Sequence, residues 1–187
     1  MVERSPSTSV RGNSVLNQPF PEKFDLLNQP GRRLLVFLRH SGCPFCKQTL
    51  GDVAAARAEI ESSGAKIVLV HMMDDRDQAK SFFARYGLDE LEALPDPDQE
   101  LYTLLEIKKG RLSEYLGPAV WLKGAVCTLW EGHSPGMPQG DVSQLGGVFL
   151  IEGGEVLKSH FCKTSADRPD YVELTKVDSI SQRRGSD

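Results

Sequence analysis

The sequence predicts an α/β fold in which a mixed central β-sheet has helices on both faces and carries a helical insertion. Two short apolar runs, residues 34–38 and 66–72, have the composition of strands buried on both faces of a sheet. A helical pattern follows each run, and a hairpin pattern occupies residues 148–161. This alternation of strands and helices, closed by a hairpin, indicates a single domain of the α/β class.

The first half of the chain predicts the order β-α-β-α. Residues 34–38 predict a central strand, because every position in the run is apolar. Apolar residues then recur at spacings of three, four and seven from Cys43 to Ile60, and Ser62-Ser63-Gly64 has the pattern of a helix C-terminus. A second buried strand over 66–72 precedes a helix over 74–86, which opens with acidic residues.

The middle of the chain predicts a helical insertion. Asp96-Pro97-Asp98 is a turn and helix-start signal, and a helical pattern over 99–107 follows it. Residues 112–130 predict a longer, irregular helical stretch broken at a glycine-proline pair. We therefore expect the insertion to occupy about residues 97–140.

The last third of the chain predicts the order β-β-α. Two strands, 148–151 and 156–161, are joined by the turn Gly153-Gly154, and a short helix is expected over 168–176. The complete order of elements is that of a thioredoxin-like fold, with helices on both faces of a mixed sheet.

Composition and charge exclude several function classes. The chain has 187 residues and a formal net charge of −4, so we expect no nucleic-acid partner. No apolar run approaches the roughly 20 residues that cross a bilayer, and the N-terminal segment lacks the apolar stretch of a secretory signal. We therefore expect a cytoplasmic protein without a membrane partner. Residues 1–20 and 179–187 are expected to be flexible tails around a domain of residues 21–178.

The motif Cys43-Pro44-Phe45-Cys46 lies where the first predicted strand passes into the first predicted helix. Unpaired N–H groups and the positive end of the helix dipole stabilise a thiolate there, so Cys43 is predicted to be a nucleophile with a depressed pKa. Cys46 lies one helical turn further along, where it can attack a sulfur bonded to Cys43. It is therefore predicted to be the resolving thiol.

Three functions are open to this cysteine pair. The first is an oxidoreductase that reduces a disulfide or peroxide substrate, with no bound cofactor and with an external thiol donor such as thioredoxin or a low-molecular-weight thiol. The second is a redox-sensing or interaction protein switched by a disulfide between the same cysteines. A zinc-binding scaffold is less favoured, because no second close pair of ligands is found among the other candidate cysteines and histidines, Cys127, His133, His160 and Cys162.

Five segments of the chain carry a family pattern: LLVFLRHSGCPFC at 34–46, DPDQELY at 96–102, GPAVWLKG at 117–124, QGDVSQLGGVFL at 139–150 and ADRPD at 166–170. In these segments, and over roughly residues 30 to 175, the chain resembles the peroxiredoxin-like 2 branch of the AhpC/TSA-related redoxins in the thioredoxin superfamily. This resemblance implies antioxidant activity and the reduction of disulfides or peroxides with electrons from an external thiol system.

Two positions differ from the patterns of related families. A standard peroxiredoxin carries Pro-x-x-x-Thr-x-x-Cys, whereas residues 39–42 here are Arg-His-Ser-Gly, so the threonine that orients a peroxide is missing. Thioredoxins carry a cis-proline before a strand, and Gly146 lies at the matching place. Glycine lets a bound chain approach the backbone closely, so Gly146 and Gly147 are predicted to line a substrate groove.

Arg39 and His40 are the candidates for supporting the thiolate, since a nearby cation favours that form. Neighbouring strand residues point to opposite faces, so only one of the two can face Cys43, and Arg39 is preferred. Cys127 and Cys162 are expected to be packing residues that stay reduced. Arg168 is expected to form an ion pair at the surface.

Overall fold

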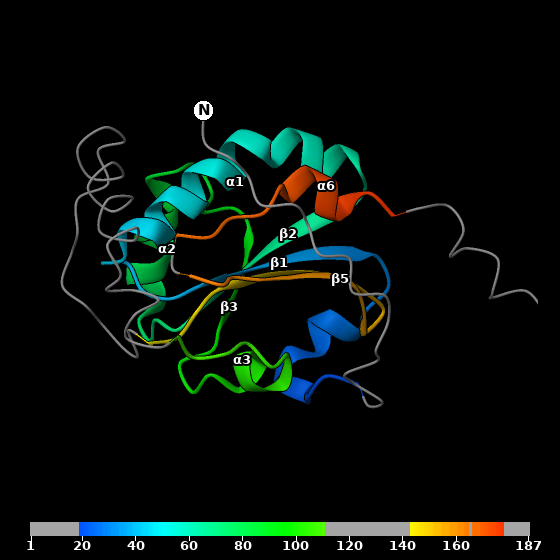
Figure 1. The fold of residues 1–187 in the computed structure, drawn as a ribbon, viewed down its shortest axis with the longest axis horizontal. Coiled ribbons are helices and arrows are strands. Elements are labelled where there is room, and N and C mark those ends of the chain that lie inside the picture. Colours follow the sequence, from blue (N-terminus) through cyan, green and yellow to red (C-terminus); the bar gives the residue numbers. More distant parts are fainter. Residues whose placement is uncertain (1–18, 111–142, 165, 178–187) are drawn as a thin grey trace, which may run out of the picture.

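The computed structural model describes residues 19–110, 143–164 and 166–177, and these form one mixed β-sheet with helices on both faces (Figure 1). The strand order is β3-β2-β1-β4-β5, so β1 is central. β2 pairs with β1 and β3 in parallel, whereas β4 pairs with β1 and β5 antiparallel. The strands are β1 Arg32–Leu38, β2 Ala65–His71, β3 Glu92–Pro95, β4 Gly147–Glu152 and β5 Glu155–Phe161.

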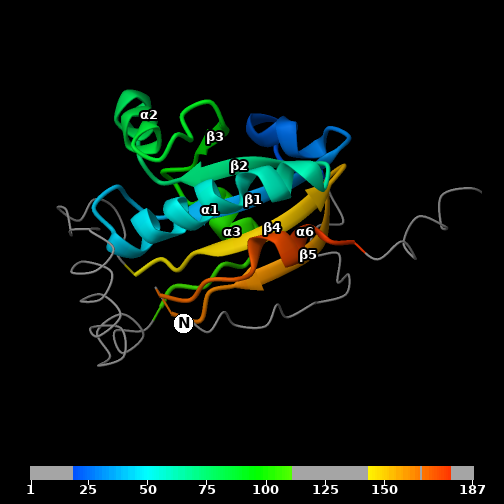
Figure 2. The same ribbon diagram turned by 90° about the horizontal axis from the view of Figure 1, so that it is seen from above.

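The helices divide between the two faces of the sheet. One face carries α1, α2 and α6, and the other carries the 3-10 helix η1 and α3 (Figure 1). From above, α1 runs over β1 and β2, and α6 lies beside it over the hairpin of β4 and β5 (Figure 2). The helices are η1 Glu22–Asn28, α1 Pro44–Ser62, α2 Arg76–Ala84, α3 Glu100–Leu104 and α6 Tyr171–Thr175.

Strand β1 separates two hydrophobic cores. Leu34, Val36 and Leu38 point into the core under α1, α2 and α6. Leu35 and Phe37 point into the core that contains η1 and α3. This alternation explains why every residue of the run is apolar, since both faces of a central strand are buried.

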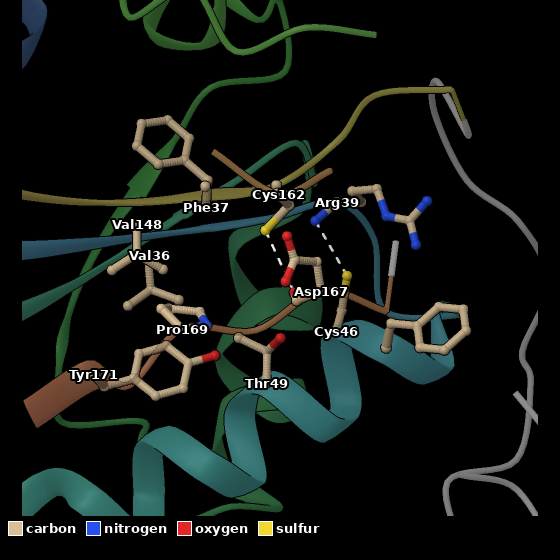
Figure 3. A pocket seen from close by; sticks show the side chains of 13 residues that line it. Val36, Phe37, Arg39, Cys46, Thr49, Val148, Cys162, Asp167, Pro169 and Tyr171 are labelled. Carbon is tan, nitrogen blue, oxygen red and sulfur yellow. Dashed lines mark hydrogen bonds between the residues drawn. The ribbon is translucent and has the colours of Figure 1, made fainter. Parts of the chain in front are cut away.

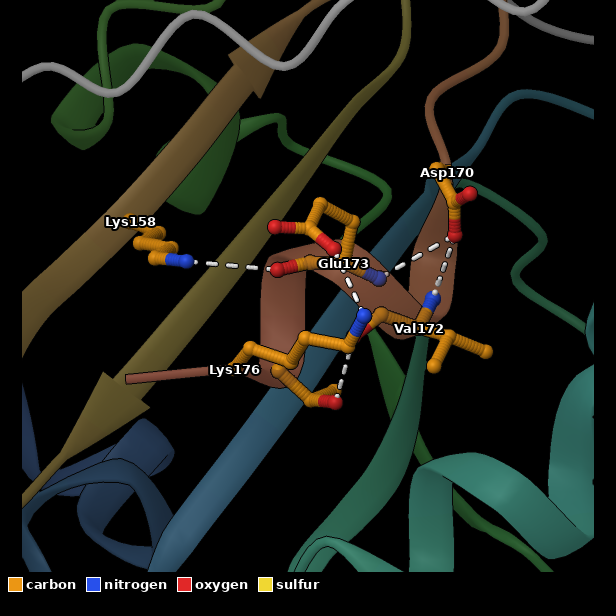
Figure 4. A network of polar contacts seen from close by, with 6 residues as sticks. Lys158, Asp170, Val172, Glu173 and Lys176 are labelled. Atoms are coloured by element: carbon orange, nitrogen blue, oxygen red, sulfur yellow. Dashed lines mark hydrogen bonds and ion pairs between the residues drawn. The ribbon is translucent and has the colours of Figure 1, made fainter. Parts of the chain in front are cut away.

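Helix α6 is fixed at both ends by polar contacts (Figure 4). The Asp170 side chain accepts hydrogen bonds from the backbone N–H groups of Val172 and Glu173, both at 3.1 Å, and so caps the first turn. Lys158 of β5 donates to the backbone carbonyl of Glu173 at 3.2 Å, and Lys176 forms an ion pair with the Glu173 carboxylate. These contacts cap α6 and connect it to β5.

The predicted thioredoxin-like α/β fold is confirmed, and each predicted strand lies within two residues of an observed one. Strand β3 was not predicted, because its four residues Glu92–Pro95 are too few to show a pattern. The C-terminal helix is shorter than expected and begins at Tyr171. The expected helical stretch over 112–130 and most of the proposed tails lie outside the described residues.

Phe20, at the end of the expected N-terminal tail, is held in the fold. Its side chain is buried in the core with Phe24 and Leu27. Its backbone is fixed as well, because the Asn28 side chain accepts from the Phe20 N–H and donates to the Phe20 carbonyl. Within the described ranges, no helix is both long enough and apolar enough to span a bilayer.

Candidate active site

The Cys-Pro-Phe-Cys motif begins helix α1 directly after strand β1. Cys43 is the N-cap residue, with an extended backbone, and its sulfur accepts a hydrogen bond from the Cys46 N–H at 3.3 Å. Pro44 occupies the first turn, where its missing N–H leaves no hydrogen bond unmade. The predicted placement of both cysteines at the helix N-terminus is therefore confirmed. Both are free thiols and buried, with 3% and 6% of their surfaces exposed.

Arg39 binds both sulfurs. Its guanidinium Nη2 donates to Cys43 Sγ at 2.7 Å, and its backbone N–H donates to Cys46 Sγ at 3.3 Å. Burial alone would lower the pKa of Arg39, but negative charge at the two sulfurs raises it above its ordinary value, so the side chain remains a cation. The sequence predicted that only one of Arg39 and His40 could face Cys43, with Arg39 preferred. The Arg39 guanidinium is the group that does so.

His40 contributes its backbone carbonyl, which accepts from the Cys43 N–H at 3.1 Å. Its imidazole is buried, and Nδ1 has no hydrogen-bond partner among the described residues. Burial, reinforced by the charge of Arg39, lowers the pKa of His40 to about 4, so the ring is neutral near pH 7. The only positive charge that touches the thiol pair within the described residues is therefore that of Arg39.

The two thiols titrate as a pair, because their side chains are hydrogen-bonded to each other. The hydrogen bond from Cys43 lowers the pKa of Cys46 to about 6, against the opposing effect of burial and with help from Arg39. Burial raises the pKa of Cys43 well above its ordinary value, and so does the charge that forms at Cys46. A depressed pKa was predicted for Cys43, whereas in the reduced structure its pKa is raised and the lowered pKa of the pair lies at Cys46.

A small pocket opens beside Cys46 (Figure 3). The described residues that line the pocket include Arg39, Cys46 and Cys162. They also include Gly146 and Gly147, where the sequence predicted a substrate groove. Cys43 is not among the described residues that line it. Its volume is about 30 Å³, which is room for about two water molecules.

Gly146 is tightly enclosed by the backbone of β1. A Cβ atom at this position would lie 3.0 Å from the Phe37 carbonyl oxygen and 3.8 Å from Cys162 Sγ. At Gly147 a Cβ atom would lie 2.9 Å from the Phe149 ring. All peptide bonds in the described ranges are trans, including the bond between Leu145 and Gly146. Close packing therefore leaves little room for a side chain at either position.

The structure adds pocket residues that were not predicted. Thr49, one helical turn after Cys46, bonds Tyr171 through its side chain, and both line the pocket. Asp167, from the segment between β5 and α6, also lines it and lies 3.5 Å from His160 Nε2. The three-residue spacing from Cys46 was a signal for Thr49, and Asp167 lies in the segment ADRPD at 166–170, which the family resemblance had singled out without assigning Asp167 a role.

The other predicted polar residues have structural surroundings. Cys162 Sγ donates to the Asp167 backbone carbonyl at 3.5 Å, and burial raises the pKa of Cys162 to about 12, so it remains a thiol. Arg168 forms the expected ion pair, with Asp52 of α1 at 2.5 Å. Cys127 and His133 lie outside the described residues. Among those that are described, no three His, Cys, Asp or Glu side chains are grouped so that they could hold a metal ion.

The mixed sheet, with a hydrogen-bonded thiol pair at the start of α1, places the chain in the thioredoxin superfamily. More specifically, it belongs to the AhpC/TSA antioxidant enzyme family, whose model matches residues 53–164, more than half of the chain. The matched region begins after Cys46, so the family assignment is independent of the thiol pair.

Relatives and solved structures agree with this assignment. The chain is 25% identical over 184 residues to human peroxiredoxin-like 2C, covering 94% of this chain and 76% of the relative. It is 26% identical over 181 residues to prostamide/prostaglandin F synthase of Danio rerio, covering 93% and 88%. The fold is similar to that of peroxidoxin BcpB from Mycobacterium tuberculosis, with a TM-score of 0.54 at 17% identity over 91% of this chain and 94% of that one.

Proposed function

We propose that the protein is a thiol-dependent oxidoreductase in which Cys43 and Cys46 alternate between a dithiol and a disulfide. The observation that carries the proposal is the contact of one buried arginine with both sulfurs, at 2.7 Å and 3.3 Å. This arrangement, with the first proton leaving at a pKa of about 6, provides a thiolate at neutral pH. A reactive thiolate next to a second thiol is the requirement for disulfide exchange.

Cys43 is the attacking sulfur in this proposal. Its proton passes along the hydrogen bond to Cys46, and the guanidinium of Arg39 stabilises the anion left on Cys43. With a disulfide substrate, Cys43 forms a mixed disulfide and releases one substrate thiolate. Cys46 passes its proton to the departing substrate thiolate and then attacks the Cys43 sulfur as a thiolate. The intramolecular disulfide forms and the second substrate thiolate leaves, so two electrons have passed to the substrate. With a peroxide substrate, Cys43 takes up one oxygen as a sulfenic acid while the other leaves as alcohol or water, and Cys46 then displaces the sulfenic oxygen as water to form the disulfide.

An external thiol donor completes the cycle by returning two electrons to the disulfide. A thioredoxin-like protein or a low-molecular-weight thiol fits this role, and both operate in the cytoplasm, where we place the protein. No bound cofactor takes part in this scheme.

Trapping the mixed disulfide tests the order of attack. The reduced full chain is mixed with a chromogenic aromatic disulfide, and released thiol is counted for wild type, Cys43→Ser, Cys46→Ser and Cys162→Ser. We expect wild type and Cys162→Ser to release two equivalents, and Cys46→Ser to release one while keeping an adduct on Cys43. An adduct that forms on Cys46 in Cys43→Ser as fast as the wild-type reaction would reverse the two roles. Disulfide formation without turnover by any thiol donor would instead favour the redox-switch function.

Disulfides or a specialised peroxide are the proposed substrates, in preference to hydrogen peroxide. Fast peroxide reduction requires donors that orient the oxygen pair and stabilise the leaving oxygen. Residues 39–42 supply no threonine, and the nearby Thr49 side chain is already bonded to Tyr171. Stopped-flow kinetics of the reduced protein test this preference. A second-order rate with hydrogen peroxide of the order of 10⁶ M⁻¹s⁻¹, within the range of efficient enzymes, would contradict it.

A further inference from the structure

One peptide group lies between the thiol pair and a buried tyrosine on the opposite face of the sheet. This is the group formed by the Leu38 carbonyl and the Arg39 N–H, at the end of β1. Its carbonyl accepts a hydrogen bond from the Tyr102 hydroxyl. Its N–H donates to Cys46 Sγ at 3.3 Å. The tyrosine and the cysteine therefore bind the two ends of the same amide.

Tyr102 is held rigidly in this position. It lies in α3, is fully buried, and packs its ring edge-on against Phe37 at a centroid distance of 4.8 Å. The buried carboxylate of Asp96 accepts hydrogen bonds from the N–H groups of Glu100 and Leu101, at 2.9 Å and 2.8 Å, and so fixes the start of α3. Burial, together with the negative charge at Cys46 and Asp96, raises the pKa of Tyr102, so its hydroxyl keeps the proton that it donates.

We infer that Tyr102 is a positioning residue for the thiol pair, acting through the Leu38–Arg39 peptide group. The hydroxyl fixes the plane of this amide, so that the Arg39 N–H points at Cys46. It also draws electron density towards the carbonyl, which makes the N–H at the other end a stronger donor to a sulfur anion. The inference rests on the proposed redox role of Cys43 and Cys46, and it adds a residue on the opposite face of the sheet to that site.

Loss of the hydroxyl leaves the other charges around Cys46 in place. Arg39 faces it from the end of β1, Cys43 from α1 and Cys162 from the end of β5. None of these side chains is changed in Tyr102→Phe, which also keeps the ring in the core. A change in thiol ionisation in this variant therefore reports on the hydroxyl and on the amide that it binds.

The test is a pH titration of thiolate absorbance in the reduced full chain. Tyr102→Phe is expected to raise the first midpoint by about half a unit, leaving about three-fold less thiolate below the midpoint. Phe149→Leu is the matched control, because it perturbs the same core without touching the amide. It should leave the midpoint unchanged even where it lowers stability. An unchanged midpoint in Tyr102→Phe, or an equal shift in Phe149→Leu, would overturn the inference.

A second substitution keeps the test decisive if the phenylalanine variant does not fold. 3-Fluorotyrosine at position 102 keeps the hydroxyl and makes it a stronger donor, so the midpoint should move down. An upward shift, or none, would count against the role of Tyr102. The proposed function has its own test. It fails if oxidation of the wild-type chain forms no disulfide between Cys43 and Cys46.

Discussion

Replacing Arg39 by methionine should raise the first pKa of the thiol pair. Methionine is a long, apolar side chain, so the change removes the cation while keeping much of the buried volume. The guanidinium lies 2.7 Å from Cys43 Sγ. An opposite charge at such a distance shifts a pKa by about 1 to 3 units. The first midpoint, at about 6 for Cys46 in the present structure, should therefore move to between about 7 and 9.

The shift in pKa should change the fraction of thiolate more than it changes the reaction rate at a given pH. At pH 7 the thiolate fraction should fall from about 90% to between about 50% and 1%. A more basic thiolate is also a better nucleophile, with a Brønsted coefficient of about 0.4 to 0.5, and this offsets much of the loss in rate. The midpoint of the titration is therefore the quantity to measure.

The assay is iodoacetamide labelling of the reduced protein across a pH series, with the modified cysteine identified by mass spectrometry. Arg39→Lys is the matched control. It keeps the charge but loses the planar fork that reaches both sulfurs, so its midpoint should lie between those of wild type and Arg39→Met. A folded Arg39→Met protein that still titrates near the wild-type midpoint would refute the electrostatic role assigned to the arginine.

Three further predictions concern stability. The first compares the reduced chain with a variant in which Cys43 and Cys46 are serine. The free energy of unfolding of the reduced chain, relative to the variant, should rise between about pH 6 and pH 8.5, where the native pair binds fewer protons than the unfolded chain, and fall above pH 8.5, where it binds more. A difference that does not change with pH in chemical denaturation would contradict this. Asp96→Ala should lower the free energy of unfolding by about 1–3 kcal/mol, because it leaves buried N–H groups of α3 unpaired. Asp98→Ala, at an exposed position, should lower it by less than about 0.5 kcal/mol. Gly146→Ala should lower the free energy of unfolding by about 1–3 kcal/mol, because the added carbon would lie 3.0 Å from a carbonyl oxygen of β1. A denaturation midpoint equal to that of wild type would contradict this and show that the neighbouring backbone can move aside.

The junction of β1 and α1 could be predicted from the sequence because all of its determinants are local. An unbroken apolar run defines a strand buried on both faces, and the two cores on either side of β1 explain that run. Cys43 and Pro44 then have the residue types that a helix start accepts, and Cys46 follows one turn later. Strand alternation also limited the contact with the thiol pair to one of Arg39 and His40.

The position of the shared proton could not be predicted in this way. The helix dipole favours an anion at Cys43, but the hydrogen bond between the sulfurs and the backbone N–H of Arg39 favour it at Cys46. The balance of these effects depends on distances that a sequence does not contain. Tyr102 was missed for a related reason, since its hydroxyl bonds a carbonyl 64 residues earlier in the chain. Phe20 was missed because a single apolar residue among polar ones gives no periodic signal.

The groups around the thiol pair also bear on which donors can reduce it. A lowered thiol pKa stabilises the reduced state relative to the disulfide, because the disulfide has no charge for Arg39 and the N–H groups to bind. One pKa unit is about 1.4 kcal/mol, which corresponds to about 30 mV for a two-electron couple. At pH 7 only the part of the shift between the first pKa of about 6 and the ambient pH counts, so Arg39 moves the couple towards a more oxidising potential by about 20 to 30 mV. A couple raised in this way is readily reduced by weakly reducing donors, including low-molecular-weight thiols. The same contact that provides a thiolate at neutral pH thus widens the range of donors that can return electrons to the pair.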